Sequence, residues 1–349
     1  MKSITVFIVL AIVIAGCADE AVEKKSVILA GQMPNLAKDG KNNLHLVYGT
    51  GDRIMYSFST NNGKSFSEPT LVAVLPGLAA SHMRGPQVAS TSEGLSAIAS
   101  NSAGNIFSYV MDEKGKWSET ARVNDADTVA KEGLMALSAD GPNAFAVWLD
   151  LRENGHNKIF GARSNDGGRR WSKNFLIYSS PDSSVCECCK PSTVIKGNDV
   201  YVMFRNWLNG NRDLYLIRSS DGGNTFGQAQ KLGDGNWKLD GCPMDGVAFV
   251  VTEGGNVETV WKRKDNIYAC ETGKPEARIG EGRNCTMEIV NGKNVYAWTE
   301  NGRVVLLKPG GTKEKLGAGS LPILKSLDNA HVICVWENEK QIHSLIIGL

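Results

Sequence analysis

An eight-residue segment rich in serine, glycine, and aspartate or asparagine recurs along this chain, at residues 164–171 (SNDGGRRW), 219–226 (SSDGGNTF) and 59–66 (STNNGKSF). Asp and Asn side chains bond backbone N–H groups ahead of them, and glycine accepts positive φ. Each copy therefore predicts a tight turn between two strands. The aromatic residue that ends each copy is expected to pack the turn against the sheet. Three copies indicate a repeat architecture.

Short strands fill the sequence between these turns, in units of three. The second strand of each unit is the most apolar, and seven such strands start at Leu44, Leu95, Phe145, Val200, Asn256, Asn294 and His331. Gly-Asn, Asp-Gly and Asn-Gly pairs between strands are typical of hairpins, and no long amphipathic helical pattern interrupts the series. A degenerate copy of the octapeptide, which keeps only part of the pattern, contains Asp112, Gly115 and Trp117. We therefore predict an all-β fold, a β-propeller of seven four-stranded blades with ~40 to 50 residues in each.

The two ends of the chain predict how this ring closes. The last unit ends at Leu349 after its third strand, while residues 26–30 (SVILA) form a strand without a partner in the first unit. We expect this N-terminal strand to complete the last blade, because closure leaves no open sheet edge. Residues 26–349 are then a single domain.

Composition limits the classes of partner. The chain has 349 residues, 42% of them hydrophobic, and a net charge of +1. Positive and negative side chains alternate without a basic stripe, so we expect no nucleic-acid partner.

The first 25 residues predict export. Residues 1–16 place Lys2 before a continuous apolar run, which is typical of a secretory signal peptide and too short for a membrane span. The end of this run resembles a bacterial lipobox, and the resemblance implies cleavage before Cys17 and lipidation of its thiol. Ala18 after it favours the outer membrane of a Gram-negative cell envelope. Residues 17–25 then form a lipidated tether to the membrane; an ordinary signal with an incidental cysteine is the alternative.

The octapeptide resembles the Asp box of the sialidase-like BNR-repeat β-propellers. Two copies match its pattern S-x-D-x-G-x-x-W/F at Ser164, Asp166, Gly168 and Trp171, and at Ser219, Asp221, Gly223 and Phe226. The third copy has Asn61 in place of the acid. The resemblance implies structural turns between the third and fourth strands of a blade. Sialidases have six blades, so six is the alternative to the count of seven.

Blade topology then predicts where a ligand site lies. Residues just before the first strand of a blade and just after the second converge on one mouth of the central channel, opposite the Asp boxes. We expect Arg84, Glu132, Asp150, Arg152, Arg205 and Asp245 there as catalytic or ligand-binding residues. The alternative for each is an ion pair on the rim, such as Asp150 with Arg152.

Resemblance to sialidases implies an arginine cluster for a substrate carboxylate, an Asp as acid and base, and a Tyr nucleophile. The family's first arginine lies in a Phe-Arg-Ile-Pro motif, but here the first inner strand reads MPNLA from Met33. No Tyr stands at a late mouth position, because Tyr268 and Tyr296 lie inside predicted strands. Exo-α-sialidase activity is therefore an open question at this stage.

Cysteines form a second candidate site. Of eight cysteines, Cys17 is expected to carry lipid. Cys186, Cys188, Cys189 and Cys242 stand at the starts of neighbouring inner strands, close enough for two disulfides, the default for an exported protein, or for a zinc site. Copper(I) held by cysteines with His82, Met83 and Met244 is a further alternative. C-x-C-C with G-C-P-x-D-G also resembles exported bacterial proteins labelled exo-α-sialidase. Cys270 and Cys285 could pair, and Cys334 is expected in the core.

These observations favour an envelope lipoprotein whose propeller binds, and in one version hydrolyses, an anionic glycan or related small ligand. A non-catalytic propeller that binds or assembles envelope proteins is the first alternative. A cysteine-based copper or zinc site is the second; otherwise no cofactor is expected.

Overall fold

The computed structural model describes residues 27–349. The predicted signal peptide at residues 1–16, the tether at 17–25 and the lipidated Cys17 lie outside these residues. Between Val27 and Leu349 no helix is long and apolar enough to cross a membrane.

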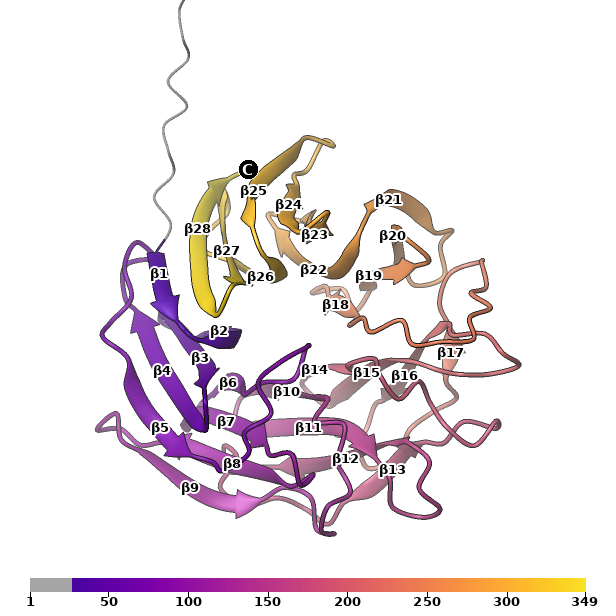
Figure 1. The fold of residues 1–349 in the computed structure, drawn as a ribbon, viewed down its shortest axis with the longest axis horizontal. Coiled ribbons are helices and arrows are strands. Elements are labelled where there is room, and N and C mark those ends of the chain that lie inside the picture. The colour runs from indigo at the N-terminus through magenta and orange to yellow at the C-terminus, as the bar shows by residue number, and fades with distance from the viewer. Residues whose placement is uncertain (1–26) are drawn as a thin grey trace, which may run out of the picture.

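Seven antiparallel sheets of four strands each surround a central axis (Figure 1). Blades 1 to 3 are β2 (Gln32–Lys38), β3 (Leu44–Thr50), β4 (Arg53–Ser59) and β5 (Thr70–Val74); β6 (Gln87–Thr91), β7 (Gly94–Ser100), β8 (Ile106–Met111) and β9 (Trp117–Arg122); and β10 (Met135–Asp140), β11 (Asn143–Asp150), β12 (Lys158–Ser164) and β13 (Phe175–Tyr178).

Blades 4 to 7 continue around the ring in the same order, with the first strand of each blade nearest the axis. They are β14 (Ser192–Lys196), β15 (Asp199–Arg205), β16 (Leu214–Ser219) and β17 (Gln230–Lys231); β18 (Ala248–Val251), β19 (Val257–Arg263), β20 (Asn266–Glu271) and β21 (Ala277–Glu281); β22 (Arg283–Val290), β23 (Lys293–Glu300), β24 (Arg303–Leu307) and β25 (Lys313–Ala318); and β26 (Ser320–Ser326), β27 (His331–Asn338) and β28 (Gln341–Gly348) with β1 (Val27–Ala30).

The N-terminal strand closes the ring. β1 pairs antiparallel with β28, from Val27 opposite Ser344 to Ala30 opposite Gln341, and forms the outer strand of blade 7. The predicted closure and the prediction of seven blades are confirmed, and the six-blade alternative is wrong.

Apolar side chains fill the spaces between blades. Seven buried clusters occur in the described chain, each built from two neighbouring blades and together covering every blade interface. The second strands are buried on both faces because a blade lies on either side of them; β11 has seven consecutive buried residues. Sheets covered on both faces need continuous apolar runs, which is why these strands stand out in the sequence.

The Asp boxes are turns between the third and fourth strands of a blade, and they contact the preceding blade. Ser164 Oγ donates to Asp166 Oδ1 (2.8 Å) and accepts from the Gly168 N–H (2.9 Å). The Gly168 carbonyl accepts from Ser108 Oγ of blade 2 (2.8 Å). The copies at Ser219 and Ser59 repeat the serine bonds. Asn61 accepts the serine hydroxyl as the aspartates do, so the third copy keeps the turn without the acid.

Gly222 and Gly223, adjacent in the second Asp box, offer a matched test of this fit. Both have positive φ, 73° and 82°. A Cβ on Gly223 would lie 2.5 Å from the Phe145 ring of blade 3, whereas a Cβ on Gly222 would meet nothing within 4 Å. We expect Gly223→Ala to destabilise the protein by roughly 1 to 3 kcal/mol more than Gly222→Ala, because only the former adds overpacking to backbone strain. Urea unfolding curves measure both; equal losses would contradict the packing role.

Candidate functional site

A central channel runs along the seven inner strands, with a cavity of about 600 Å³. Its wall combines apolar residues with polar side chains that include Asn35, Gln87, Ser138 and Thr193. A volume of this size suits a ligand as large as one or two sugar rings.

Lys190 brings a positive charge into this channel. It precedes β14 of blade 4, and its Nζ donates to Gln87 Oε1 of blade 2 (2.8 Å), so the side chain reaches past blade 3. Asn35 Nδ2 of blade 1 donates to the same Gln87 oxygen (3.3 Å). Burial lowers the pKa of Lys190 to about 8. Within residues 27–349 no carboxylate oxygen lies within 4 Å of this ammonium, so its charge is available to a ligand.

Apolar side chains at the mouth are held by unusual backbone. Met83 and Met244 precede inner strands, and Met33 and Leu321 are the second residues of β2 and β26. Their φ angles are 71°, 44°, 51° and 57°, in that order. Such values are uncommon without glycine and cluster at functional sites. Met83 of blade 2 comes within 3.8 Å of where a Cβ on Gly246 of blade 5 would lie. Met244 and Leu321 pack on the apolar cluster that contains Met83. These side chains narrow the mouth.

Arg84 and Glu132 form one pair near this mouth. Arg84 donates from Nε to the Glu132 carbonyl (2.5 Å) and from Nη2 to its carboxylate (3.4 Å). The pair links the connection before blade 2 to the connection before blade 3. Both side chains are partly exposed, which matches the rim ion pair of the sequence analysis.

Asp150 and Arg152 form a second, more buried pair. Asp150 is fully buried and accepts from Trp148 Nε1 (2.7 Å) and from Arg152 Nε and Nη2 (both 2.9 Å). The Arg152 guanidinium also bonds Asp125 and lies 4.3 Å from the centre of the Phe160 ring. The aspartate oxygens are therefore occupied by the blade itself.

Arg205 and Asp245 lie in a third, buried region between blades 4, 5 and 6. Arg205 donates to the carbonyls of Arg212 (2.8 Å) and Lys262 (2.9 Å). Asp245 is fully buried and accepts from the Asn284 N–H (3.1 Å). Burial raises the pKa of Asp245, and the nearby Arg205 charge opposes that shift.

The lining of the described channel includes none of these six charged residues. Their side chains bond to other protein groups, in three separate clusters, and their predicted roles in catalysis or ligand binding stay predictions. Lys190, Gln87 and Asn35 take their place. Lys190 does stand at a predicted strand start, yet nothing local in the sequence shows that its side chain crosses to blade 2.

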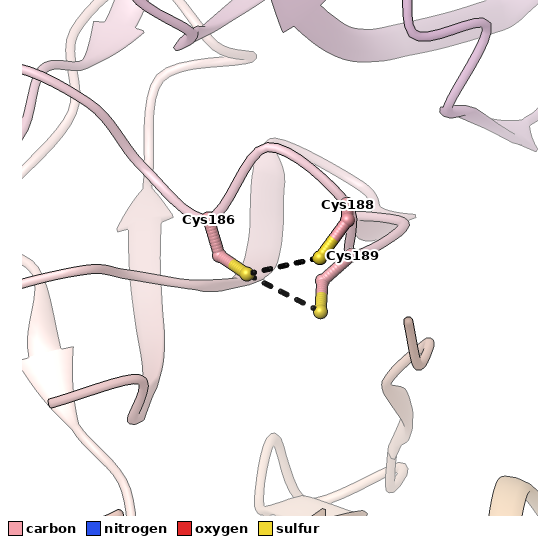
Figure 2. Close-up of side chains that lie close together, drawn as sticks. All are labelled: Cys186, Cys188 and Cys189. Atoms are coloured by element: carbon pink, nitrogen blue, oxygen red, sulfur yellow. Dashed lines mark hydrogen bonds between the residues drawn. The ribbon is translucent and has the colours of Figure 1, made fainter. Parts of the chain in front are cut away.

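The cysteines of the second candidate site do lie together (Figure 2). Cys188 and Cys242 form a disulfide with an S–S distance of 2.06 Å. Cys186 and Cys189 are free and buried, with their Sγ atoms 3.4 Å apart, and Cys186 Sγ lies 3.8 Å from Cys188 Sγ. One disulfide is therefore present in place of the two expected.

Charge around these sulfurs favours a thiolate. Arg212 Nη1 donates to Cys186 Sγ (3.1 Å). The hydrogen bond between Cys186 and Cys189 lowers the pKa of Cys186 to about 7, with help from Arg205 and Arg212 and against the effect of burial. Burial raises the pKa of Cys189.

The cluster does not fit a tetrathiolate zinc site or a copper(I) site in this form. The Sγ atoms of Cys186, Cys188 and Cys189 lie within 4.8 Å of one another. However, Cys188 and Cys242 have no thiolate to offer while they are bonded to each other, and the neighbouring arginine repels a cation.

The remaining cysteines are isolated. Cys270 and Cys285 are both free, so the suggested pairing is wrong. They pack in different interblade clusters, and Cys270 contacts Thr259. Cys334 is fully buried in the core, as predicted.

No protein-family model matches this sequence, and no curated protein resembles it closely enough in sequence to be a relative. Solved structures do resemble its fold. Virginiamycin B lyase from Staphylococcus aureus has a TM-score of 0.55 and 14% identity, over 93% of this chain and 100% of that one. The GH93 α-L-arabinofuranosidase of Fusarium graminearum, solved with arabinobiose, has a TM-score of 0.52 and 11% identity, over 91% and 93%. NanB sialidase from Streptococcus pneumoniae has a TM-score of 0.46 and 12% identity, over 91% of this chain and 68% of that one. At these identities the likeness shows a β-propeller fold shared with carbohydrate-active and other enzymes.

Asp150 is expected to be needed for folding. We expect Asp150→Ala to lower the free energy of unfolding by about 3 kcal/mol or more, because it leaves Arg152 and the Trp148 N–H without their buried acceptor. Glu281→Ala, which removes the exposed partner of Arg278, should change it by less than about 1 kcal/mol. Thermal or urea unfolding decides; an unchanged stability for Asp150→Ala would contradict the structural assignment.

Proposed function

We propose that this protein is a ligand-binding propeller of the bacterial cell envelope, in which the channel holds a small anionic ligand, an acidic sugar or a glycan end that carries a carboxylate. The ammonium of Lys190 is the observation that carries the proposal. It is a cation without a carboxylate partner, inside a cavity of sugar size, next to amide side chains.

Several features support a carbohydrate as the ligand. Asn35, Ser90 and Ser138 give the channel amide and hydroxyl groups that can exchange hydrogen bonds with sugar hydroxyls, and the buried Ser138 Oγ has no hydrogen-bond partner within the described chain. Met33 and Met83 add an apolar face that a sugar ring can cover. The arabinofuranosidase with arabinobiose is a propeller of similar fold that binds a sugar.

We propose that the protein binds this ligand and does not hydrolyse it. A glycosidase needs two carboxyl groups facing the substrate, one of them free to donate a proton. Asp150 is held by Trp148 and Arg152, and Asp245 lies buried against the Asn284 backbone. The first inner strand also lacks the arginine of the sialidase motif. The carboxylate of the ligand is therefore assigned to Lys190.

Lys190→Met tests the proposal directly. Titrations with N-acetylneuraminate, glucuronate and galacturonate should show binding to the natural protein, and the variant should bind at least about tenfold more weakly because a charged hydrogen bond is lost. Lys131→Met, an exposed lysine before blade 3 that lies outside the channel, is the matched control. Fluorogenic glycosides are assayed with the natural protein in parallel. Their hydrolysis would show that the protein is a glycosidase and would contradict a purely binding function.

Binding should also depend on pH. The Lys190 ammonium is charged below its pKa of about 8 and loses its proton above it, so affinity should fall as the pH rises from 7 to 10. Lys190→Arg should keep its affinity over this range, because arginine stays charged. A flat profile for the natural protein, or binding by Lys190→Met at full strength, would rule out this site.

Membrane attachment is proposed through Cys17, with residues 18–25 as a charged tether. The apolar run of residues 1–16 and its lipobox-like end support this. Ala18 supports the outer membrane as the location, where the propeller could meet glycans or envelope proteins.

Cys17→Ser should move the protein from the membrane fraction to the soluble fraction, because the thiol that would carry the lipid is gone. Fractionation followed by immunoblotting measures this. Continued membrane association of the variant would contradict a lipid anchor at this residue.

A further inference from the structure

We propose that Cys186, Cys188, Cys189 and Cys242 form a thiol–disulfide exchange relay, in which the Cys188–Cys242 disulfide passes its oxidation state to the buried Cys186–Cys189 pair. This inference is independent of ligand binding in the channel. It assigns a redox reaction to the cluster.

The three short sulfur separations define the route. Cys242 is exposed and Cys188 is half-buried, so their disulfide can be reached from solvent. Cys186 Sγ lies 3.8 Å from Cys188 Sγ on the inner side, at van der Waals contact. Cys189 Sγ lies 3.4 Å from Cys186 Sγ. Figure 2 shows the Cys186 sulfur pointing toward both of the others. Each step of an exchange therefore joins sulfurs that already touch.

The exchange needs no outside oxidant. The Cys186 thiolate attacks Cys188 Sγ; the Cys186–Cys188 bond forms as the Cys188–Cys242 bond breaks, and the electron pair leaves on Cys242. The Cys189 thiolate then attacks Cys186 Sγ and releases Cys188 as a thiolate. The protons lost by Cys186 and Cys189 are taken up by Cys242 and Cys188 through water. The product holds a buried Cys186–Cys189 disulfide and an accessible Cys188 and Cys242 dithiol.

Arg212 makes Cys186 the attacking group. Its Nη1 donates to Cys186 Sγ at 3.1 Å, and the Cys186 N–H bonds the Arg205 carbonyl. Arg212 is itself fixed, by Glu187 at 3.3 Å and by the Trp207 ring 4.9 Å from its guanidinium. A positive donor at this distance stabilises a thiolate, which is the reactive form of cysteine. Cys186 and Cys189 also have the C-x-x-C spacing that redox pairs use.

The released dithiol gives the relay an outlet. Cys188 and Cys242, once reduced, can pass their electrons to an external disulfide that reaches the exposed Cys242, and an external dithiol can run the sequence in reverse. The expected partner is therefore a thiol or disulfide of the envelope that reacts at Cys242. The buried Cys186–Cys189 pair supplies or accepts the two electrons of that reaction.

Alkylation of the full-length protein in detergent, without added reductant, tests the relay. Iodoacetamide at pH 8 should trap the exchanged form, so that Cys242 and Cys188 become alkylated while a Cys186–Cys189 disulfide appears in non-reducing peptide maps. Cys186→Ser should keep the Cys188–Cys242 disulfide and leave Cys242 unlabelled. Cys189→Ser should stop after the first step, with a Cys186–Cys188 disulfide and label on Cys242 alone.

Two further variants separate the reaction from a folding effect. Arg212→Gln should slow labelling of Cys242 about tenfold or more, since it removes the donor to the thiolate. Cys334→Ser, which alters a distant core thiol, should label as the natural protein does. Unfolding curves confirm that each variant is folded. Recovery of the Cys188–Cys242 disulfide alone from the natural protein, with Cys242 unlabelled, would overturn the proposal, as would equal labelling in Cys186→Ser.

Discussion

The pairing of β1 with β28 is the constraint on which the rest of this molecule depends. It joins strands that lie at opposite ends of the described chain, so the first strand of the chain completes the last blade and closes the ring. Each blade then has a neighbour on both faces, and the apolar cluster between blades 7 and 1 can form only in that closed arrangement. A blade alone would expose the double-sided second strand that marks it in the sequence.

Closure also decides what gathers at the axis. Seven inner strands bring the residues at or before their starts to one mouth, and several of these residues, Met33, Met83 and Met244 among them, have positive φ without being glycine. The surrounding sheets hold this strained backbone in place. As a result, side chains from distant blades meet: Lys190 of blade 4 reaches Gln87 of blade 2, and Met83 approaches blade 5. The channel is therefore a product of closure and belongs to no single blade.

Sequence reasoning reached the fold because its signals are local. The hydrogen bonds of a turn such as that at Ser164 all lie within eight residues. A strand that is buried on both faces is recognised from its own continuous run of apolar residues. Blade number and closure follow by counting. Site residues depend on partners outside their own strand: Arg84 is held by Glu132, and Arg205 by the carbonyls of Arg212 and of Lys262 in blade 5. Blade topology predicted which strand ends these residues occupy, but it could not tell a side chain held by the protein from one free to bind. The same topology brought Cys188 and Cys242 close together. The suggested pairing of Cys270 with Cys285 failed because these residues lie in β20 and β22 of different blades and pack in different clusters.

One short segment links the two sites. Residues 186–190 carry Cys186, Cys188 and Cys189 and end at Lys190, and the disulfide ties this segment to the connection before blade 5. That cross-link spans 54 residues of chain. By the loop-entropy relation it disfavours the unfolded chain by roughly 4 kcal/mol, whereas a bond between Cys186 and Cys189 would close a far smaller loop and contribute roughly half as much. An exchange of disulfides would therefore lower the free energy of unfolding and remove the cross-link between residues 186–190 and the connection before blade 5. Ring closure places the short segment that carries Lys190 and three of these cysteines beside the channel, and the Cys188–Cys242 disulfide holds that segment in place.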